Sequence, residues 1–327
     1  MKKNRSLAAV LLIICISACA VFFGCSEAAE PAGEAEPKKP ALPPEVSSGK
    51  VYAAELLDEE RDSITVGKLS KDHIYYEEVI GIDPECADYI EEISIYDKEI
   101  DDTFVVHVSL PPEYDENEEY PMVLMTDGVW RLSDHPELRP LMKDGEIEPV
   151  ILVSIGYPND YDYEDIRCRD LVDEPDSFLH FIVDNLVPYL LEAYPASSEN
   201  MTLAGHSLGG YWGYYALFHN DTIGKNTFKN FFIGSPSIVE AKSYFMNMNY
   251  FEERFFQRGG KLDCNVYVTV GSEEEDWFIG ASDRFIELLQ GRNYEGLVLT
   301  SETIEGHVHE TVFKPSIKNT LEMYYGK

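Results

Sequence analysis

Short apolar runs alternate with longer segments of helical periodicity from about residue 93 onward, and this alternation constrains the fold more than any other feature. The strand-like runs are 103–110, 121–126, 150–155, 201–204, 231–234, 265–270 and 297–303, and the helix-like segments are 177–194, 207–218, 282–290 and 315–325. Continuous short apolar runs are typical of strands buried on both faces of a sheet. Strands that alternate with helices predict an α/β fold, with a mostly parallel central sheet covered by helices on both faces.

The first 50 residues differ from the rest in composition. Residues 1–25 combine a basic start with an apolar run, which predicts an export signal of the lipoprotein type. That run, about 17 residues long, is short for a membrane span. Residues 26–50 contain five Pro and five Glu and predict a polar tether. We expect residues 51–92, which are acidic and weakly patterned, to form an N-terminal extension packed on a main domain at 93–327.

Two cysteines of the signal are candidates for lipid modification. Cys19 follows Ile-Ser-Ala, the better lipobox spelling, whereas Cys25 stands where the apolar run gives way to the polar tether. We favour Cys25; Cys19, a plain cleaved signal and an uncleaved anchor are the alternatives. In each case we expect the folded part outside the cytoplasm, as a cell-envelope lipoprotein or secreted, with membrane contact only through the anchor.

Charge and cysteine spacing exclude several classes of partner. The chain has 327 residues, with 60 Asp and Glu against 26 Lys and Arg, which gives a net charge of −34. Because nucleic-acid binders need clustered Lys and Arg, we expect no DNA or RNA partner. Outside the signal, Cys86, Cys168 and Cys264 form no CxxC pair and no zinc-type spacing. The acidic stretches 113–119 and 160–165 lack the glycine and ligand spacing of an EF-hand. We therefore expect no metal and no cofactor.

One short motif carries chemistry: Gly205-His206-Ser207-Leu208-Gly209 spells GxSxG. It follows a strand-like run and opens a helix-like segment, which is the context of a nucleophile elbow. A serine held there projects at the carboxyl edge of the sheet, beside a helix N-terminus whose N–H groups can hold a developing oxyanion. The motif predicts Ser207 as a nucleophile and the Leu208 N–H as an oxyanion donor. A glycine-rich turn with an idle serine is the alternative.

A serine nucleophile needs a base and an orienting acid, which follow it in that fold class in the order acid, then histidine. His219 closes the helix that Ser207 opens, so we expect the base at His307 or His309, which spacing does not separate. The acid is expected in the loop after 265–270. Its candidates are Glu273, Glu274, Glu275 and Asp276.

A second oxyanion donor is expected after the run 121–126, at the backbone N–H of Gly128 or Val129. Asp127-Gly128 is also an ordinary turn pair, so a plain β-turn is the alternative.

Aromatic and basic residues adjoin these elements. The candidate substrate-pocket residues are Trp130, Arg131, Tyr211, Trp212 and Trp277. The aromatic ones indicate an apolar or aromatic acyl pocket, with core packing as the alternative. Arg131, Arg167 and Arg169 could receive an anionic substrate. For the last two, a structural ion pair with Asp170 or another neighbour is an equal alternative.

The order of these motifs resembles the esterase family of the α/β-hydrolases, and within it the siderophore-esterase-like or esterase D-like group. The matching runs are Leu110 to Asp115, Tyr120-Pro121, Asp127-Gly128, Ile155 to Pro158, Arg167 to Leu171, Ala204 to Gly210, Ser235 to Ser237 and Gly306 to Val312. The resemblance covers Ile93 to Tyr325 and implies an α/β-hydrolase fold.

The resemblance also implies roles. The family's Gly-x-x-His block places the base at His309, and its strand-Gly-x-x-Glu block places the acid at Glu274. It implies an exported serine carboxylic-ester hydrolase, siderophore-esterase-like, that acts on a small-molecule or glycan-linked ester. Feruloyl or acetyl-xylan-type carbohydrate esters are the alternative substrates, and a non-catalytic envelope binding module on the same fold is the alternative function.

Overall fold

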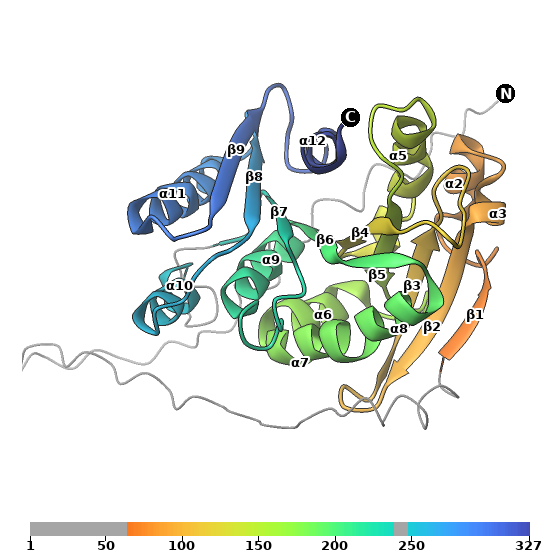
Figure 1. Cartoon of the computed structure of the whole chain (residues 1–327), viewed down its shortest axis with the longest axis horizontal. Helices are drawn as coiled ribbons and strands as arrows, with labels where there is room; N and C mark the ends of the chain where they lie inside the picture. Colours follow the sequence, from red (N-terminus) through yellow and green to blue (C-terminus); the bar gives the residue numbers. More distant parts are fainter. Residues whose placement is uncertain (1–63, 239–247) are drawn as a thin grey trace, which may run out of the picture. The chain divides into compact units, whose positions relative to one another are not determined.

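A nine-stranded sheet runs through the part of the chain that the structure, a computed structural model, describes: residues 64–238 and 248–327. Its strands are β1 (Ile64–Lys68), β2 (Ile90–Asp97), β3 (Asp102–Ser109), β4 (Tyr120–Met125), β5 (Ile151–Gly156), β6 (Ala196–His206), β7 (Asn230–Gly234), β8 (Asn265–Gly271) and β9 (Val298–Ile304). They lie in the order β1-β2-β3-β5-β4-β6-β7-β8-β9 (Figure 1). Neighbours are antiparallel from β1 to β5 and parallel from β5 to β9. The predicted mostly parallel α/β sheet is confirmed.

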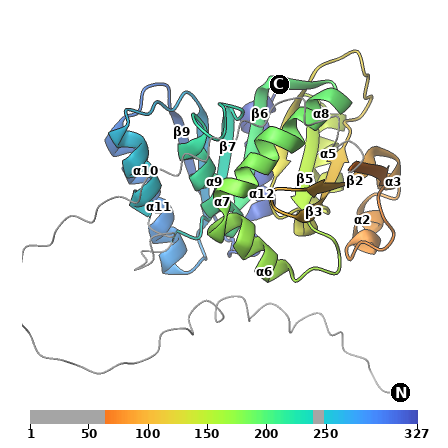
Figure 2. The ribbon, with the colours of Figure 1, turned by 90° about the horizontal axis from the view of Figure 1, so that it is seen from below.

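Helices cover both faces of this sheet. They are α2 (Tyr76–Ile82), α3 (Cys86–Tyr89), α4 (Gly128–Arg131), α5 (Asp134–Lys143), α6 (Tyr163–Cys168), α7 (Pro175–His180), α8 (Val187–Ala193), α9 (Leu208–His219), α10 (Met248–Gln257), α11 (Asp276–Arg292) and α12 (Phe313–Tyr325), with π-helical segments η4 (Arg169–Asp173) and η5 (Phe181–Leu186) on either side of α7. Figures 1 and 2 show α9 and α12 on opposite sides of the sheet. None of the described helices has the length and apolar character needed to cross a membrane.

Each face of the sheet buries its own hydrophobic cluster, because successive residues of a strand point to opposite faces. In β4, Met122 and Leu124 join the cluster that contains residues of α7, α8 and α9. Val123 and Met125 join the cluster that contains residues of α5 and α12. All six residues of β4 are buried. Burial on both faces therefore explains why this strand reads as a continuous apolar run.

The N-terminal region has regular structure of its own. Residues 64–92 form β1, α2, α3 and the start of β2: the two strands add to the edge of the sheet, and the two helices share a hydrophobic cluster with Leu132 of the main domain. Four of the five residues of β1 are exposed, and this edge strand therefore carries no apolar run that would reveal it. The expected export signal at 1–25, with Cys19 and Cys25, the tether at 26–50 and residues 51–63 lie outside the described residues.

Candidate active site

Ser207 lies in a sharp turn between the end of β6 and the start of α9, with φ of 61° and ψ of −121°. A positive φ is uncommon for a residue with a side chain, and such strain gathers at functional sites. The flanking glycines are required by close packing. A Cβ on Gly205 would lie 2.1 Å from the Gly209 carbonyl oxygen, and a Cβ on Gly209 would lie 2.2 Å from Thr126 Oγ1. The GxSxG segment thus forms the strand–turn–helix that its sequence predicts.

Hydrogen bonds from neighbouring segments hold the Ser207 backbone. Its N–H donates to the Gly234 carbonyl at 3.0 Å, and its carbonyl accepts from the N–H groups of Tyr211 at 2.9 Å and Ser237 at 3.0 Å. The Ser207 hydroxyl lies 3.3 Å from Ser237 Oγ. Among the described residues no hydrogen bond joins Ser207 Oγ to a histidine. In ligand-free enzymes, catalytic hydrogen bonds are often long or poorly aligned and tighten when substrate binds, so this does not exclude a histidine as the base.

His309 and Glu274 form a hydrogen-bonded pair. Nδ1 of His309 lies 2.7 Å from Oε2 of Glu274, whose side chain has no solvent-exposed area. The other carboxylate oxygen, Oε1, accepts from Ser235 Oγ at 2.5 Å and from the Gly271 N–H at 2.7 Å. These donors suit an ionised carboxylate, which accepts hydrogen bonds and donates none.

The structure separates the sequence candidates for the acid and the base. Of the four acidic residues in the loop 273–276, which we call the acidic loop, only Glu274 is buried; Glu273, Glu275 and Asp276 are exposed. His307 Nδ1 lies 3.2 Å from Thr311 Oγ1, and His307 meets the acidic loop through its carbonyl, which accepts from Glu273 at 3.0 Å. The geometry thus brings His309 together with Glu274, and their catalytic roles remain predictions.

The His309 ring stands beside the serine turn. Its centroid is 4.5 Å from that of His206, the residue before Ser207, and 3.9 Å from that of Phe278 in α11. Burial lowers the pKa of His206 well below its ordinary range, and the neighbouring His309 and the Arg131 charge act in the same direction. His206 is therefore a neutral ring against the candidate base.

The turn after β4 packs against the serine turn. Asp127 begins it with φ of 61°, and α4 starts at Gly128. A Cβ on Gly209 would lie 2.8 Å from Asp127 Oδ2, so this carboxylate lies against the first turn of α9. A Cβ on Gly128 would lie 2.5 Å from the backbone of β5, so only glycine fits there. Gly128 and Val129 lie in the first turn of α4, and Leu208 lies in the first turn of α9. N–H groups in the first turn of a helix have no carbonyl acceptor within the helix, so they can hold an oxyanion.

The arginines near this edge are paired with carboxylates. Arg167 forms a bidentate ion pair with Asp127: Nε lies 2.5 Å from Oδ1 and Nη2 lies 3.2 Å from Oδ2. Nη1 of Arg131 lies 3.3 Å from Asp134 Oδ2. Burial raises the pKa of Asp134 to about 6 against the opposing effect of the Arg131 charge. Both arginines therefore have much of their charge neutralised locally.

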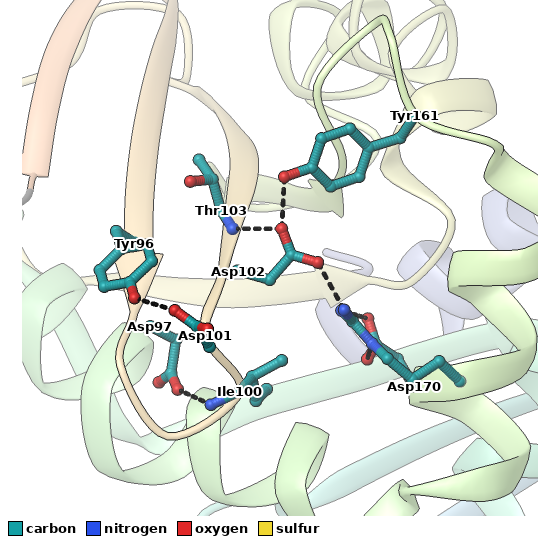
Figure 3. A network of polar contacts seen from close by, with 9 residues as sticks. Tyr96, Asp97, Ile100, Asp101, Asp102, Thr103, Tyr161 and Asp170 are labelled. Carbon is teal, nitrogen blue, oxygen red and sulfur yellow. Dashed lines mark hydrogen bonds and ion pairs between the residues drawn. The ribbon is translucent and has the colours of Figure 1, made fainter.

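Arg169 belongs to a polar network at the start of β3. Its Nε donates to Asp170 at 2.7 Å, and its Nη1 donates to Asp102. Figure 3 shows Asp102 also accepting from the Tyr161 hydroxyl and, at 2.7 Å, from the Thr103 N–H. Of the two roles expected for Arg167 and Arg169, the structure shows the ion pair.

The four aromatic residues predicted for a substrate pocket differ in exposure. Trp130 is partly exposed, and Trp277 is 38% exposed where α11 begins. Tyr211 and Trp212 are only 1% and 0% exposed and belong to the hydrophobic core. Trp212 Nε1 donates to the Pro175 carbonyl at 3.3 Å. The prediction is wrong for Tyr211 and Trp212 because other helices pack over α9, so its whole central part is buried.

Two serines with a place in the site were not assigned roles from the sequence. Ser235 donates to Glu274, and Ser237 contacts the Ser207 hydroxyl. Both directly follow β7, which pairs in parallel with β6 on one side and β8 on the other. Because parallel strands bring their carboxyl ends to one edge, a Ser-Pro-Ser segment after β7 must lie between the loops that carry Ser207 and Glu274.

Strand β6 delivers Ser207 to the carboxyl edge of the sheet, and the loops after β8 and β9 deliver Glu274 and His309 to the same edge. This chain order on a mostly parallel sheet defines an α/β-hydrolase fold. The chain belongs to the family described as Putative esterase, whose model matches residues 98–310.

Known proteins share parts of this sequence and fold. The ferri-bacillibactin esterase BesA of Bacillus subtilis (strain 168) is 26% identical over 200 residues, which cover 54% of this chain and 63% of BesA. The BES protein from Bacillus cereus superposes with a TM-score of 0.64 at 24% identity, covering 73% of this chain and 95% of that chain. The siderophore hydrolase EstA from Aspergillus nidulans gives 0.59 at 20% identity, covering 72% and 93%. At these identities the solved structures show the shared fold.

Proposed function

We propose that this protein is an exported serine esterase that cleaves a siderophore-type carboxylic ester through an acyl-enzyme at Ser207. One observation carries the proposal: a strained serine and a histidine held by a buried carboxylate lie at the same edge of the sheet. Membership of the esterase family and likeness to a ferri-bacillibactin esterase support the reaction and the substrate class.

In the proposed mechanism Ser207 Oγ attacks the ester carbonyl carbon while Nε2 of His309 takes the hydroxyl proton. Glu274, at 2.7 Å from Nδ1, keeps the other nitrogen free to accept that proton and stabilises the imidazolium. The N–H groups of Leu208 and of Gly128 or Val129 hold the negative oxygen. His309 gives the proton to the leaving alkoxide as the C–O bond breaks. A water deprotonated by His309 then releases the carboxylic acid from Ser207.

The residues around the site favour an ester with aromatic groups and little negative charge. The chain has three tryptophans; Trp212 is in the core, and the two with exposed surface, Trp130 and Trp277, both adjoin site elements. Exposed indole rings can stack on aromatic substrate groups. Arg131 and Arg167 lie against carboxylates, so an anionic substrate gains little from them.

A fluorophosphonate probe tests the enzyme, because it reacts with activated serines. Labelling of the wild type that is lost in Ser207→Ala and kept in Ser282→Ala, a buried serine of α11, supports the proposal. A folded wild type that takes no label contradicts it and favours a non-catalytic envelope module that binds a siderophore or glycan.

A substrate panel tests the ester class. It compares iron-free and ferric siderophores with feruloyl and acetyl xylo-oligosaccharides under identical conditions. The highest kcat/KM on a siderophore supports the proposal, and the highest value on a carbohydrate ester reassigns the substrate.

The export part of the proposal rests on the sequence of residues 1–25. Metabolic labelling with a palmitate analogue tests the anchor. Label that is lost in Cys25→Ser and kept in Cys19→Ser supports Cys25, and the reverse pattern moves the anchor to Cys19. No label on the wild type contradicts lipidation at either cysteine.

A further inference from the structure

His206, the residue before the candidate nucleophile, has no step in the mechanism above. Its ring nevertheless contacts the candidate base: the centroids of His206 and His309 are 4.5 Å apart, and their planes differ by 35°. Phe278 makes a second contact, with its centroid 3.9 Å from that of His309 and an angle of 22°. The His206 pair is tilted and lies at the near end of the centroid range of attractive ring pairs, and the Phe278 pair is stacked and closer than that range.

Two rings pack against the imidazole. The ring of Phe278 is stacked on it, and the ring of His206 is tilted against it. Phe278 is 4% exposed, so its own position is fixed by packing. The Glu274 bond fixes one edge of the imidazole, and the stacked rings limit its tilt.

One nitrogen of the His206 ring makes no hydrogen bond to the protein groups described. Nε2 of His206 is buried and has no hydrogen-bond partner among the described protein groups. Burial, the neighbouring His309 and the charges of Arg131 and Arg167 lower the pKa of His206 well below its ordinary range, so the ring stays uncharged beside an imidazole that becomes positive during the reaction. A protonated His206 would repel that imidazolium.

We propose that His206 is a positioning residue: together with Phe278 it fixes the plane of the His309 imidazole so that Nε2 points at Ser207. This inference rests on the proposed function. It assigns the histidine of the GxSxG segment a steric role, in which any flat uncharged ring of similar size would serve.

Two substitutions separate ring shape from imidazole chemistry. His206→Phe keeps a flat ring and removes a buried nitrogen that has no protein partner, so its thermal stability should equal or exceed that of the wild type. His206→Ala removes the ring that packs against His309. His219→Ala is the matched control, because His219 is also a stacked histidine, with its ring 4.1 Å from Tyr215, at the far end of α9.

The measurements are kcat and KM on a p-nitrophenyl ester for the full-length variants. We expect His206→Ala to lower kcat about 10- to 100-fold with little change in KM, since misplacing a catalytic group costs rate more than binding. His206→Phe and His219→Ala should stay near the wild-type kcat. Wild-type kcat in a folded His206→Ala, or a folded His206→Phe as impaired as the alanine variant, would overturn the inference.

A second readout does not depend on turnover. In histidine-labelled protein, the imidazole NMR signals of His309 should be sharp in the wild type and in His206→Phe and broadened in His206→Ala. Equal linewidths in all three proteins overturn the inference. Absence of Ser207-dependent hydrolysis in the wild type is a different outcome, and it contradicts the proposed function instead. Where His206→Ala does not fold, Phe278→Ala removes the other ring that packs against His309 and must show the same losses.

Discussion

His309 Nδ1 lies 2.7 Å from Glu274 Oε2, and the other oxygen of that carboxylate accepts from Ser235 and Gly271. Three donors therefore converge on one buried carboxylate. A carboxylate held in this way can rotate little, so it defines where the imidazole edge must lie. The pair thus fixes one edge of the candidate base, His309.

Replacing Glu274 tests this orientation. Glu274→Gln keeps the shape but can present an amide N–H to Nδ1, which favours the wrong tautomer of His309. We expect kcat to fall by about 10²- to 10⁴-fold, as for the loss of a triad acid in general. Steady-state kinetics on a p-nitrophenyl ester measure it. Glu273→Gln, on the exposed neighbour in the same loop, is the control; equal kcat values for the two variants would mean that Glu274 does not orient the base.

Ser235 should contribute through Glu274. Ser235→Ala removes one donor, at 2.5 Å from Oε1, and leaves the Gly271 N–H in place. Hydrogen bonds to charged groups contribute about 1.5–3 kcal/mol, so we expect kcat to fall by about tenfold or more with KM unchanged. Ser282→Ala, at a buried serine whose Oγ has no partner among the described residues, controls for loss of a buried hydroxyl. A change confined to KM would contradict the assigned role.

The strands that carry the site could be predicted from sequence because burial on both faces leaves an unbroken apolar run, as in β4. The edge strand β1 could not, since its residues face water and its pairing is made by backbone groups that any sequence supplies. The short helix α4 could not be predicted either, because its position depends on the turn at Asp127, which is held by tertiary packing.

The same distinction applies within the candidate site. GxSxG predicts the serine turn because a Cβ at Gly205 or Gly209 would collide with atoms packed against that turn. Nothing local distinguishes Glu274 from its acidic neighbours; burial does, and burial depends on β7 and β9 packing around the loop. Aromatic character likewise does not separate Trp277 at the surface from Trp212 in the core.

The two late histidines should differ sharply in effect. His309→Ala removes the proposed base, and we expect kcat/KM on p-nitrophenyl acetate to fall about a thousandfold or more. His307→Ala should stay within about threefold of the wild type, because its ring contacts Thr311 and the carbonyl that meets Glu273 is retained. The reverse pattern would reassign the base to His307.

A buried histidine should make the fold acid-sensitive. His135 has no exposed surface, its Nε2 lies 2.9 Å from Ser154 Oγ, and burial lowers its pKa to about 3. An unfolded histidine titrates near pH 6.5, so below that pH the unfolded chain binds a proton that the folded chain refuses. Above pH 6.5 His135 has no effect of this kind on stability. As the pH drops from there toward 3, His135 lowers the free energy of unfolding by about 1.4 kcal/mol per pH unit.

Urea unfolding at pH 7.5 and pH 5 measures this. His135→Asn does not titrate, so its free energy of unfolding should fall by about 2 kcal/mol less than that of the wild type between the two pH values. His307→Asn, at a partly exposed ring, is the control and should follow the wild type. Parallel pH dependence of the wild type and His135→Asn would show that His135 takes up a proton in the folded state.

Salt dependence should report the charge that the site prefers. The chain carries a net charge of −34, and Arg131 and Arg167 are paired with Asp134 and Asp127, so an anionic ester approaches against repulsion. The screening length falls from about 30 Å at about 0.01 M to about 8 Å at about 0.15 M salt. Over that range kcat/KM for an anionic ester should rise, while that for its neutral analogue stays level.

Asp134→Asn frees Arg131 and should raise the low-salt kcat/KM for the anionic ester alone. A rate on the anionic ester that falls with salt would instead mean that unpaired positive charge attracts it, and the preference for weakly charged substrates would then be wrong.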